Sequence, residues 1–218
     1  MTQNKKKVVI IDYQLGNLYS VKQACDTVGM NVLVSSNKED ILAADALILP
    51  GVGAFIEAMN NLSKLDLIDA IKSKVSIGTP LFGICLGLQL LFTKSEEFGS
   101  GNGLDLISGI IKKFPEKFDD RKIKVPHITW NQVYNLKNSW EETPLRDIIN
   151  HEFMYFIHSY YVQPNNDKCI LTNTNYDGIE FCSSIIQNNI FATQFHPEKS
   201  ADNGISIYKN WALINKIL

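Results

Sequence analysis

The chain has 218 residues, 45% of them hydrophobic and 20% charged. This length can close one substantial core and leaves little for a second, so we expect a single domain over residues 1–218. The formal net charge is −2, and outside Lys5–Lys7 the basic residues are scattered, which argues against a nucleic-acid-binding surface. No apolar run approaches the roughly 18 residues of a membrane span or forms a signal-peptide core, so we expect a soluble, cytoplasmic protein.

The four cysteines show no C-x-x-C spacing, so neither a zinc site nor a disulfide framework is indicated. Free thiols fit a reducing cytosol. A free cysteine is most often a small buried hydrophobic residue, so a catalytic role needs support from its surroundings. The four positions are Cys25, Cys85, Cys169 and Cys182.

The first half of the sequence predicts a parallel sheet with helices on both faces. Apolar residues recur at helical spacing from Leu18 to Val28, and Gly29 follows where a left-handed C-cap would end the helix. Further helices are expected near 54–63 and 67–74. Continuous apolar runs indicate buried strands at 8–11, 31–35, 46–49 and 81–84. This alternation of strands and helices implies right-handed crossovers.

The second half predicts antiparallel strands, because short turns such as Asn188-Asn189 separate its apolar runs. The strands are expected at 154–157, 169–174, 179–186 and 190–195. A last helix is expected over 203–217. Its inward face would carry Ile205, Tyr208, Trp211 and Ala212.

Cys85 stands where an apolar strand runs into an apolar helix, with Gly83 and Gly87 two residues to either side. This G-x-C-x-G spacing is typical of a nucleophile elbow, in which a strained turn exposes the nucleophile and a side chain at either glycine would collide with neighbouring elements. The start of a helix also favours the thiolate. The alternative is a buried cysteine in an ordinary turn, and the spacing favours the catalytic interpretation.

His196 is the histidine with an acid placed to orient it. Pro197 should fix an extended turn in which His196 and Glu198 project to the same side. The carboxylate would then hold the tautomer whose free nitrogen faces Cys85, which is the arrangement of a nucleophilic triad. A histidine after a strand is by itself more often structural, but the elbow favours catalysis here.

The segment Pro50–Gly53 follows a buried strand and opens a helix, so its glycines would let backbone N–H groups approach a substrate oxygen. We expect oxyanion-hole donors at Gly51 and Val52 and at the N–H of Leu86. A plain turn with glycines at a helix start is the alternative. The segment lacks the G-x-x-x-x-G-K-[ST] spacing of a phosphate loop.

Taken together, the segments 50–53, 83–87 and 196–198 resemble the class I, triad-type glutamine amidotransferases. Further segments are similar to the glutaminase subunits of imidazole glycerol phosphate synthase. These are Asp12-Tyr13 with Gly16–Leu18, Ser95–Glu97, Pro126-His127 with Trp130-Asn131, Tyr155-Phe156 with His158–Tyr160, and Gln194–Ser200. The similarity runs from Val8 to about Trp211.

This resemblance implies a flavodoxin-like, three-layer α/β fold with a parallel central sheet and additional antiparallel strands in the C-terminal half. It implies glutamine hydrolysis through a thioester on Cys85, without metal or organic cofactor. The ammonia would pass to a (β/α)₈ cyclase subunit, the heterodimer partner that makes imidazole glycerol phosphate and AICAR in histidine biosynthesis. By the same resemblance, Gln89, Glu97, Ser159 and Tyr160 would bind the substrate, and Trp130, Asn131 and Lys199 would lie near the partner interface.

From the residues alone, Glu97 is equally well a solvated acid in a polar loop, and for Trp130 core packing is the more common role. Two residues depart from the family pattern, because Gln14 and Thr129 stand where the family usually has glycine. A Cβ at either position disfavours positive φ, so the local backbone must differ from that of the family or be strained. Neither departure touches the triad, and the one at Thr129 bears on coupling to the partner.

Several other functions share these motifs. A paralogous glutaminase could supply ammonia to a sugar amidotransferase in surface polysaccharide synthesis, and the two departures favour this alternative. A cysteine peptidase or γ-glutamyl hydrolase could use the same elbow, but the sequence 194–198 argues against it. The intact triad argues against a non-catalytic binding module, and the segment 155–160 argues against amidotransferases of anthranilate, purine or pyrimidine synthesis. In all glutaminase interpretations we expect weak activity without the partner, with a rearrangement of Pro50–Gly53 as the switch.

Overall fold

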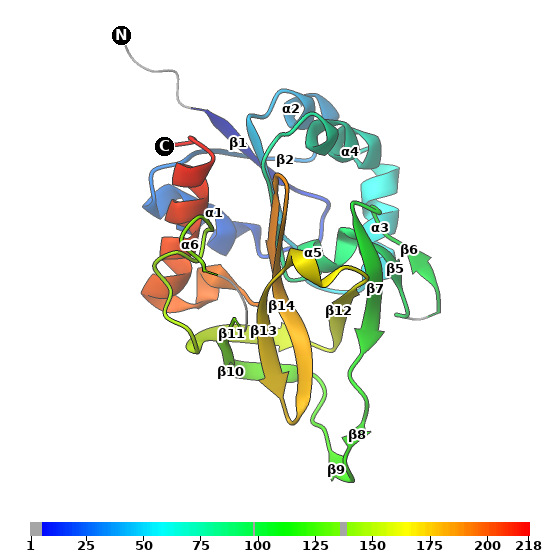
Figure 1. The fold of residues 1–218 in the computed structure, drawn as a ribbon. Coiled ribbons are helices and arrows are strands. Elements are labelled where there is room, and N and C mark those ends of the chain that lie inside the picture. The colour runs from blue at the N-terminus through cyan, green and yellow to red at the C-terminus, as the bar shows by residue number, and fades with distance from the viewer. Residues whose placement is uncertain (1–5, 98, 136–138) are drawn as a thin grey trace.

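The computed structural model describes residues 6–97, 99–135 and 139–218. One long sheet dominates it, with the strand order β2-β1-β3-β4-β15-β14-β12-β7-β5-β6, and β13 paired to β14 (Figure 1). Its parallel part comprises β1 (Lys7–Ile11), β2 (Asn31–Ser35), β3 (Ala46–Leu49), β4 (Leu81–Ile84) and β15 (Ile190–Thr193). The predicted parallel sheet is thus confirmed, and β15 extends it by one strand.

The rest of the long sheet is mostly antiparallel. β14 (Ile179–Gln187) pairs antiparallel with β12 (Tyr160–Pro164), β13 (Ile170–Tyr176) and β15. Beyond β12 lie β7 (Ile107–Lys113), β5 (Phe92–Ser95) and β6 (Gly101–Asn102), of which β5 runs parallel to β7. A 3₁₀ turn, Asp167–Cys169, precedes β13.

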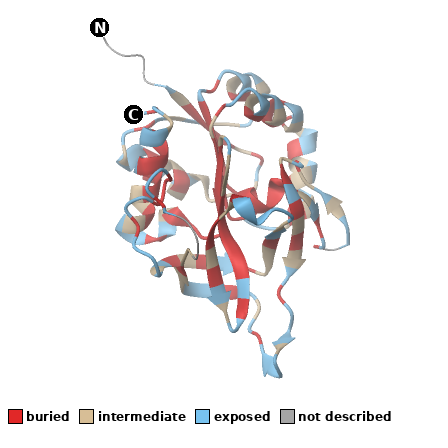
Figure 2. Ribbon diagram, in the orientation of Figure 1, coloured by how far each residue is buried: buried red, intermediate tan, exposed pale blue. Residues whose placement is uncertain are grey.

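Helices cover the parallel strands on both faces, and successive side chains of each strand enter opposite cores. In β1, for instance, Val8 and Ile10 belong to one buried cluster and Val9 and Ile11 to the other. The first core lies beneath α1 (Leu18–Thr27) and α6 (Ala201–Ile214). The second lies beneath α2 (Lys38–Leu42), α3 (Phe55–Lys64), α4 (Ile68–Ser76) and α5 (Leu86–Leu90). The strands at the centre are therefore buried on both sides (Figure 2).

Two small sheets stand apart from the long one. β10 (His127–Val133) pairs antiparallel with β11 (Glu152–His158), and β8 (Lys117–Phe118) pairs with β9 (Arg121–Lys122) in a hairpin at the lower end of the view in Figure 1. No helix in the described ranges is both long and apolar enough to cross a membrane.

Several expected elements differ in extent or partner. The helix α1 ends as predicted, with Gly29 at φ +86°, and the last helix covers 201–214 rather than 203–217. The short helix α2 and the strands between 92 and 133 were not predicted. The strand at 154–157 is part of β11, which pairs with β10 and not with the strands that follow it. The expected hairpin at Asn188-Asn189 joins β14 to β15, but β15 ends at Thr193 and also pairs parallel with β4.

Candidate active site

Cys85 lies on the turn between β4 and α5, with φ +54° and ψ −107°. A positive φ is strained for a residue with a Cβ, and such strain is concentrated at functional sites. A Cβ on Gly87 would overlap the carbonyl oxygen of Leu49, and one on Gly83 would lie 3.0 Å from the Cβ of Ala192. The turn and the crowding around both glycines are those of the predicted elbow. The helix that follows is short, because Phe92 already begins β5.

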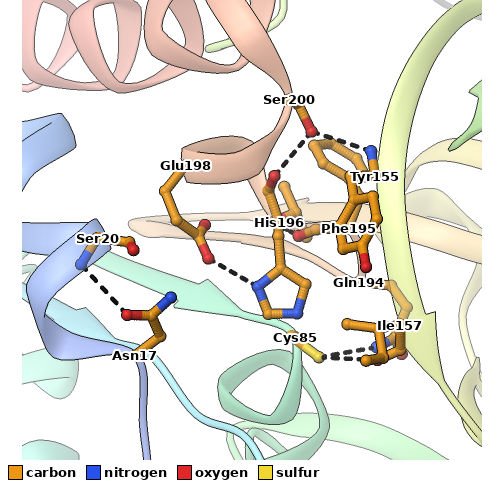
Figure 3. A network of polar contacts seen from close by, with 11 residues as sticks. Asn17, Ser20, Cys85, Tyr155, Ile157, Gln194, Phe195, His196, Glu198 and Ser200 are labelled. Atoms are coloured by element: carbon orange, nitrogen blue, oxygen red, sulfur yellow. Dashed lines mark hydrogen bonds and ion pairs between the residues drawn. The ribbon is translucent and has the colours of Figure 1, made fainter. Parts of the chain in front are cut away.

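His196 reaches Cys85 because β15 is the parallel neighbour of β4. The N–H of Cys85 donates to the carbonyl of Thr193 at 2.7 Å, and the chain continues from there to His196. Nδ1 of His196 lies 2.7 Å from Oε1 of Glu198, and the two side chains are only 2% and 1% exposed. The imidazole lies between Glu198 and Cys85 (Figure 3), and its Nε2 is buried without a hydrogen-bond partner among the described residues. The three side chains therefore have the arrangement of a nucleophilic triad.

The backbone after His196 is not the extended turn expected from Pro197. His196 itself is extended, but Pro197–Lys199 form a single 3₁₀ turn. This turn brings Glu198 back toward the ring. Ser200 braces it, because its hydroxyl donates to the carbonyl of His196 at 2.7 Å and accepts the N–H of Tyr155 at 3.0 Å. The N–H of His196 donates in turn to the carbonyl of Tyr155 at 2.9 Å, so two hydrogen bonds join β11 to this turn.

The charge state of His196 follows from its neighbours. Burial by itself would lower the pKa of His196, but the negative charges of Cys85 and Glu198 outweigh it and raise the pKa to about 10. The ring is therefore an imidazolium at neutral pH. A cation beside Cys85 stabilises a thiolate, which is the nucleophilic form of cysteine.

Two further groups contact the sulfur, and the sequence analysis did not identify either. Nε2 of Gln194 donates to Sγ of Cys85 at 3.7 Å, and the thiol reaches the carbonyl of Ile157 at 3.8 Å. A thiolate cannot donate, so only the Gln194 contact persists once Cys85 ionises. Knowledge that 190–193 runs parallel to 81–84 would have identified Gln194, since it follows the strand that ends beside Cys85.

The predicted oxyanion hole is not formed in this structure. The N–H of Leu86 donates to the carbonyl of Gly51 at 3.4 Å, so one expected donor is occupied. In a trans peptide the C=O and N–H point in opposite directions, so the N–H of Val52 faces away from Leu86. The hydroxyl of Tyr13 donates to the carbonyl of Pro50 at 2.7 Å and holds this part of the loop. Rotation of the Gly51-Val52 peptide would turn the N–H of Val52 toward Leu86 and release the N–H of Leu86.

The four expected substrate residues lie on three neighbouring segments. Gln89 on α5 donates from Nε2 to the carbonyl of Tyr160 at 3.0 Å. Glu97 is not a solvated acid, because it is 8% exposed and accepts the N–H of Phe55 at the start of α3 at 2.6 Å. Burial raises the pKa of Glu97, and burial followed by the charge of Glu97 raises that of Tyr160. Ser159 precedes Tyr160 and its carbonyl accepts the N–H of Phe114 at 3.1 Å.

The expected partner residues lie on or beside β10 and β11. Trp130 is 46% exposed and packs edge-on against Tyr155 with 6.1 Å between ring centroids, so it is not a core residue. Nζ of Lys199 lies 5.8 Å from the centroid of the Tyr155 ring. Asn131 is half-buried, and its Nδ2 donates to the carbonyl of Asn175 at 3.0 Å. Exposed apolar side chains surround Trp130 on the same face of this sheet, namely Ile128, Phe153 and Ile157.

The two departures from the family pattern have different outcomes. Gln14 has φ +71°, so the expected strain is present there. Its N–H donates to Oδ1 of Asp12 at 2.9 Å, which supports the turn. Thr129 lies within β10 opposite Phe156 and is not among the residues with positive φ, so the strand accommodates it without strain.

Comparisons with known proteins agree with this fold. The family model described as "Glutamine amidotransferase class-I" matches residues 9–214. A crystal structure titled as a glutamine amidotransferase superposes with a TM-score of 0.72 at 16% identity, covering 96% of this chain and 98% of the other. The structure of PurLQS from Thermotoga maritima gives a TM-score of 0.69 at 15% identity, covering 96% and 98%. At such identities only the fold is shared.

Closer relatives share the sequence as well. The imidazole glycerol phosphate synthase subunit HisH of Moorella thermoacetica is 45% identical over 206 residues, covering 94% of each chain. The subunit of the same name from Geobacter metallireducens is 41% identical over 208 residues, covering 94% of this chain and 97% of the relative. That from Aquifex aeolicus is 44% identical over 206 residues, covering 94% and 95%. The chain therefore belongs to the class-I glutamine amidotransferase family and, within it, to the family of HisH subunits.

Proposed function

We propose that this chain is the glutaminase subunit of an imidazole glycerol phosphate synthase, which hydrolyses glutamine and passes the ammonia to the cyclase subunit in histidine biosynthesis. The observation that carries the proposal is the buried Cys85–His196–Glu198 arrangement in a chain 41% and 45% identical to HisH subunits over nearly its whole length. These relatives favour neither the polysaccharide paralogue nor a peptidase. A thiolate nucleophile and four free cysteines suit the reducing cytoplasm, where we place the enzyme, and we treat the chain as one catalytic domain.

The geometry supports the following acylation step. The thiolate of Cys85 attacks the side-chain amide carbon of glutamine, and Gln194 keeps a hydrogen-bond donor on the sulfur until it reacts. The imidazolium of His196 then gives its proton to the amide nitrogen, which leaves as ammonia while the glutamyl thioester remains on Cys85. Glu198 holds Nδ1, so the proton transferred is the one on Nε2, the nitrogen that faces Cys85.

Hydrolysis of the thioester uses the same groups in reverse. The ring, now neutral, removes a proton from water, and the resulting hydroxide attacks the thioester carbonyl. Glutamate leaves, and Cys85 returns to the thiolate beside a protonated His196. The bond between Glu198 and Nδ1 keeps the ring in one orientation through both halves of the reaction.

The position of Gly51 supports a low activity for the isolated chain. Both halves of the reaction pass through an oxyanion, and removal of one hydrogen-bond donor from such a site typically costs two to three orders of magnitude in rate. Here the carbonyl of Gly51 occupies the N–H of Leu86. We infer that rotation of the Gly51-Val52 peptide switches the enzyme on and that docking of the partner favours the rotated form.

The outer face of the β10–β11 sheet is the surface we assign to the cyclase subunit. Exposed aromatic residues with an adjacent cation are typical of interface centres. Trp130, Tyr155 and Lys199 form such a group. The same sheet reaches the active site, because the carbonyls of Tyr155 and Ile157 contact His196 and Cys85. Ammonia released at Cys85 therefore forms directly behind the proposed interface.

The test is glutamate release by the purified chain, alone and with the cyclase subunit of its organism plus the ribotide substrate, with Cys85→Ala as the blank. We expect strong stimulation by the liganded partner, which the Cys85→Ala variant lacks. A chain that hydrolyses glutamine but is indifferent to the cyclase would instead serve another ammonia acceptor. A chain with no glutaminase activity under any of these conditions would refute the proposal.

A further inference from the structure

We propose that two buried histidines, His127 and His158, are positioning residues that connect Asn131 on β10 to the nucleophile Cys85 through one continuous chain of hydrogen bonds. The inference deepens the proposed function, on which its partner-dependent part rests. It gives the partner-facing sheet a physical route to the nucleophile that does not pass through the Pro50–Gly53 loop.

The first half of this series of hydrogen bonds runs from β10 to β12. Nδ2 of Asn131 lies 3.3 Å from Nε2 of His127, and Nδ1 of His127 lies 2.9 Å from Nε2 of His158. Nδ1 of His158 then lies 2.8 Å from the carbonyl oxygen of Tyr160. Asn131 follows the exposed Trp130 along β10, but its side chain lies on the inner face of the sheet, so this half begins one residue behind the proposed interface.

The second half runs from Tyr160 to the sulfur. The carbonyl of Tyr160 also accepts from Nε2 of Gln89 at 3.0 Å. The same Nε2 donates to Oε1 of Gln194 at 3.1 Å, and Nε2 of Gln194 donates to Sγ of Cys85 at 3.7 Å. Tyr160 is thus the point where the two halves meet.

The direction of every link in the first half is fixed by that carbonyl. A carbonyl oxygen only accepts, so His158 must carry its proton on Nδ1, and its Nε2 must accept when the ring is neutral. His127 must then donate from Nδ1, which leaves its own Nε2 to accept from Asn131. Burial lowers the pKa of His127 to about 4, and burial with the nearby His127 lowers that of His158 to about 3, so both rings are neutral at physiological pH. One tautomer of each ring satisfies all the contacts.

The surroundings hold this arrangement rigidly. His127 is fully buried and His158 is 6% exposed. Aromatic rings enclose the pair, with Tyr176 4.0 Å and Phe156 5.0 Å from His127 between centroids, and Phe181 5.1 Å from His158. A buried polar group that loses its partner here has no water to replace it, so the loss of one hydrogen bond weakens the next one in the series. If Nε2 of His158 no longer accepts a hydrogen bond from His127, the bond from His158 to the carbonyl of Tyr160 weakens. Gln89 and Gln194 are then held less firmly, because Gln89 donates to that same carbonyl.

Four variants separate the links. His127→Phe fills the aromatic enclosure but removes both contacts of the ring. His127→Asn can place its amide nitrogen where Nδ1 lies, so it keeps the donor to His158 and loses the acceptor for Asn131. Asn131→Leu, at a half-buried strand position, removes the first link, together with the bonds of Asn131 to the carbonyl of Asn175 and the N–H of Gln132, and leaves both histidines in place. Tyr176→Phe is the matched control, because it changes the same enclosure without touching the chain and removes only a hydroxyl bound to the carbonyl of Lys124.

Two measurements are made on each variant. The first is the rate at which iodoacetamide alkylates Cys85 in the isolated chain, which needs neither glutamine nor partner. The second is the stimulation of glutaminase kcat by the cyclase subunit with its ribotide, with KM for glutamine determined separately. We expect His127→Phe to lower both by about tenfold, equivalent to about 1.4 kcal/mol. His127→Asn and Asn131→Leu should keep the wild-type alkylation rate and lose about tenfold in stimulation, and Tyr176→Phe should match the wild type in both.

The pattern decides the inference. Equal losses of the alkylation rate in His127→Phe and His127→Asn would show a merely structural role and overturn it. So would losses in the Tyr176→Phe control as large as those in His127→Phe. Wild-type stimulation of Asn131→Leu by the cyclase subunit would overturn the proposed connection to the interface. If the wild-type chain shows no stimulation at all, the proposed function fails, and the alkylation rates of His127→Phe and His127→Asn still decide whether the histidines position Cys85. If His127→Phe does not fold, Asn131→Leu and His127→Asn carry the test.

Discussion

The N–H of Leu86 donates to the carbonyl oxygen of Gly51 over 3.4 Å, a length at which a backbone hydrogen bond is weak. The same N–H is the donor that we propose for an oxyanion on Cys85. On that proposal, the bond to Gly51 that holds the loop in this arrangement is easily exchanged for a stronger, charge-assisted one in the transition state.

Tyr13→Phe should raise the partner-independent activity. The hydroxyl of Tyr13 donates to the carbonyl of Pro50 at 2.7 Å in a buried position, and its loss removes one restraint on the loop. We expect the basal glutamate release to increase by about three- to tenfold, consistent with the net worth of one hydrogen bond. Steady-state assays without the cyclase subunit measure this. A basal rate at or below that of the wild type would show that Tyr13 does not restrain the loop.

Cys85→Ala should abolish glutamate release, by roughly four orders of magnitude or more, because the nucleophile itself is removed. Cyclase turnover supplied with ammonium salts should remain, since the substitution leaves the outer face of β10 and β11 intact. Ammonium-dependent turnover of the same complex is the control, because it shows that the cyclase subunit is intact when glutamate release is lost. Residual glutamine-dependent turnover above background would exclude Cys85 as the nucleophile.

His196 should titrate far above an ordinary histidine. Its pKa of about 10 depends on Cys85 and Glu198, against the opposing effect of burial. We expect Cys85→Ala and Glu198→Gln each to lower the value, measured from the imidazole signals by NMR. Because the folded-state pKa exceeds the unfolded value of 6.5, the protonated ring contributes stability that is complete below about pH 6.5 and lost as pH rises through about 10. An unchanged pKa in both variants would show that the three groups are not coupled.

Gly87→Ala should destabilise the fold by about 3 kcal/mol or more, because its Cβ would overlap the carbonyl of Leu49 in β3. Gly16→Ala is the control, since its Cβ would lie 3.5 Å from the nearest atom at a position without positive φ. Urea denaturation of both variants measures the free energy of unfolding. Equal free energies of unfolding for the two variants would mean that β3 and α5 can move apart with little loss of stability.

Trp130→Ala should weaken binding of the cyclase subunit by about 30-fold, as expected for an interface hot spot worth about 2 kcal/mol. Titration calorimetry measures the dissociation constant. Ile77→Ala is a suitable control, because Ile77 is 72% exposed but follows α4 at the opposite end of the molecule in Figure 1. A similar small effect of both substitutions would move the interface away from the β10–β11 sheet.

The turn at Cys85 and the closeness of His196 to Glu198 could be predicted because the signals for both are local. Gly83, Cys85 and Gly87 reside in one turn, and His196 and Glu198 in another. The parallel strands were also predictable, since burial on both faces produces continuous apolar runs such as 8–11 and 81–84. Gln89 and Glu97 were assigned only through resemblance, because nothing in their local sequence distinguishes them from ordinary polar residues.

What the sequence could not predict depends on pairing between distant segments. Both faces of β10 mix apolar and polar residues, and its most exposed side chains include the apolar Ile128 and Trp130, so its pattern indicates no core face and its partner β11 could not be inferred. The role of Gln194 likewise depends on β15 lying beside β4. Whether the N–H of Leu86 is occupied depends on the orientation of one peptide, Gly51-Val52. The pattern of side chains in the sequence carries no information about that orientation.

The pairing of β15 with β4 has a consequence for how the protein is made. Cys85 and His196 come from opposite halves of the chain, and the bond from the N–H of Cys85 to the carbonyl of Thr193 forms only when these two strands meet. Contacts so distant in sequence are among the slow steps of folding. In a nascent or half-folded chain the proposed nucleophile and base are therefore still apart, and we expect no release of ammonia before the fold is complete.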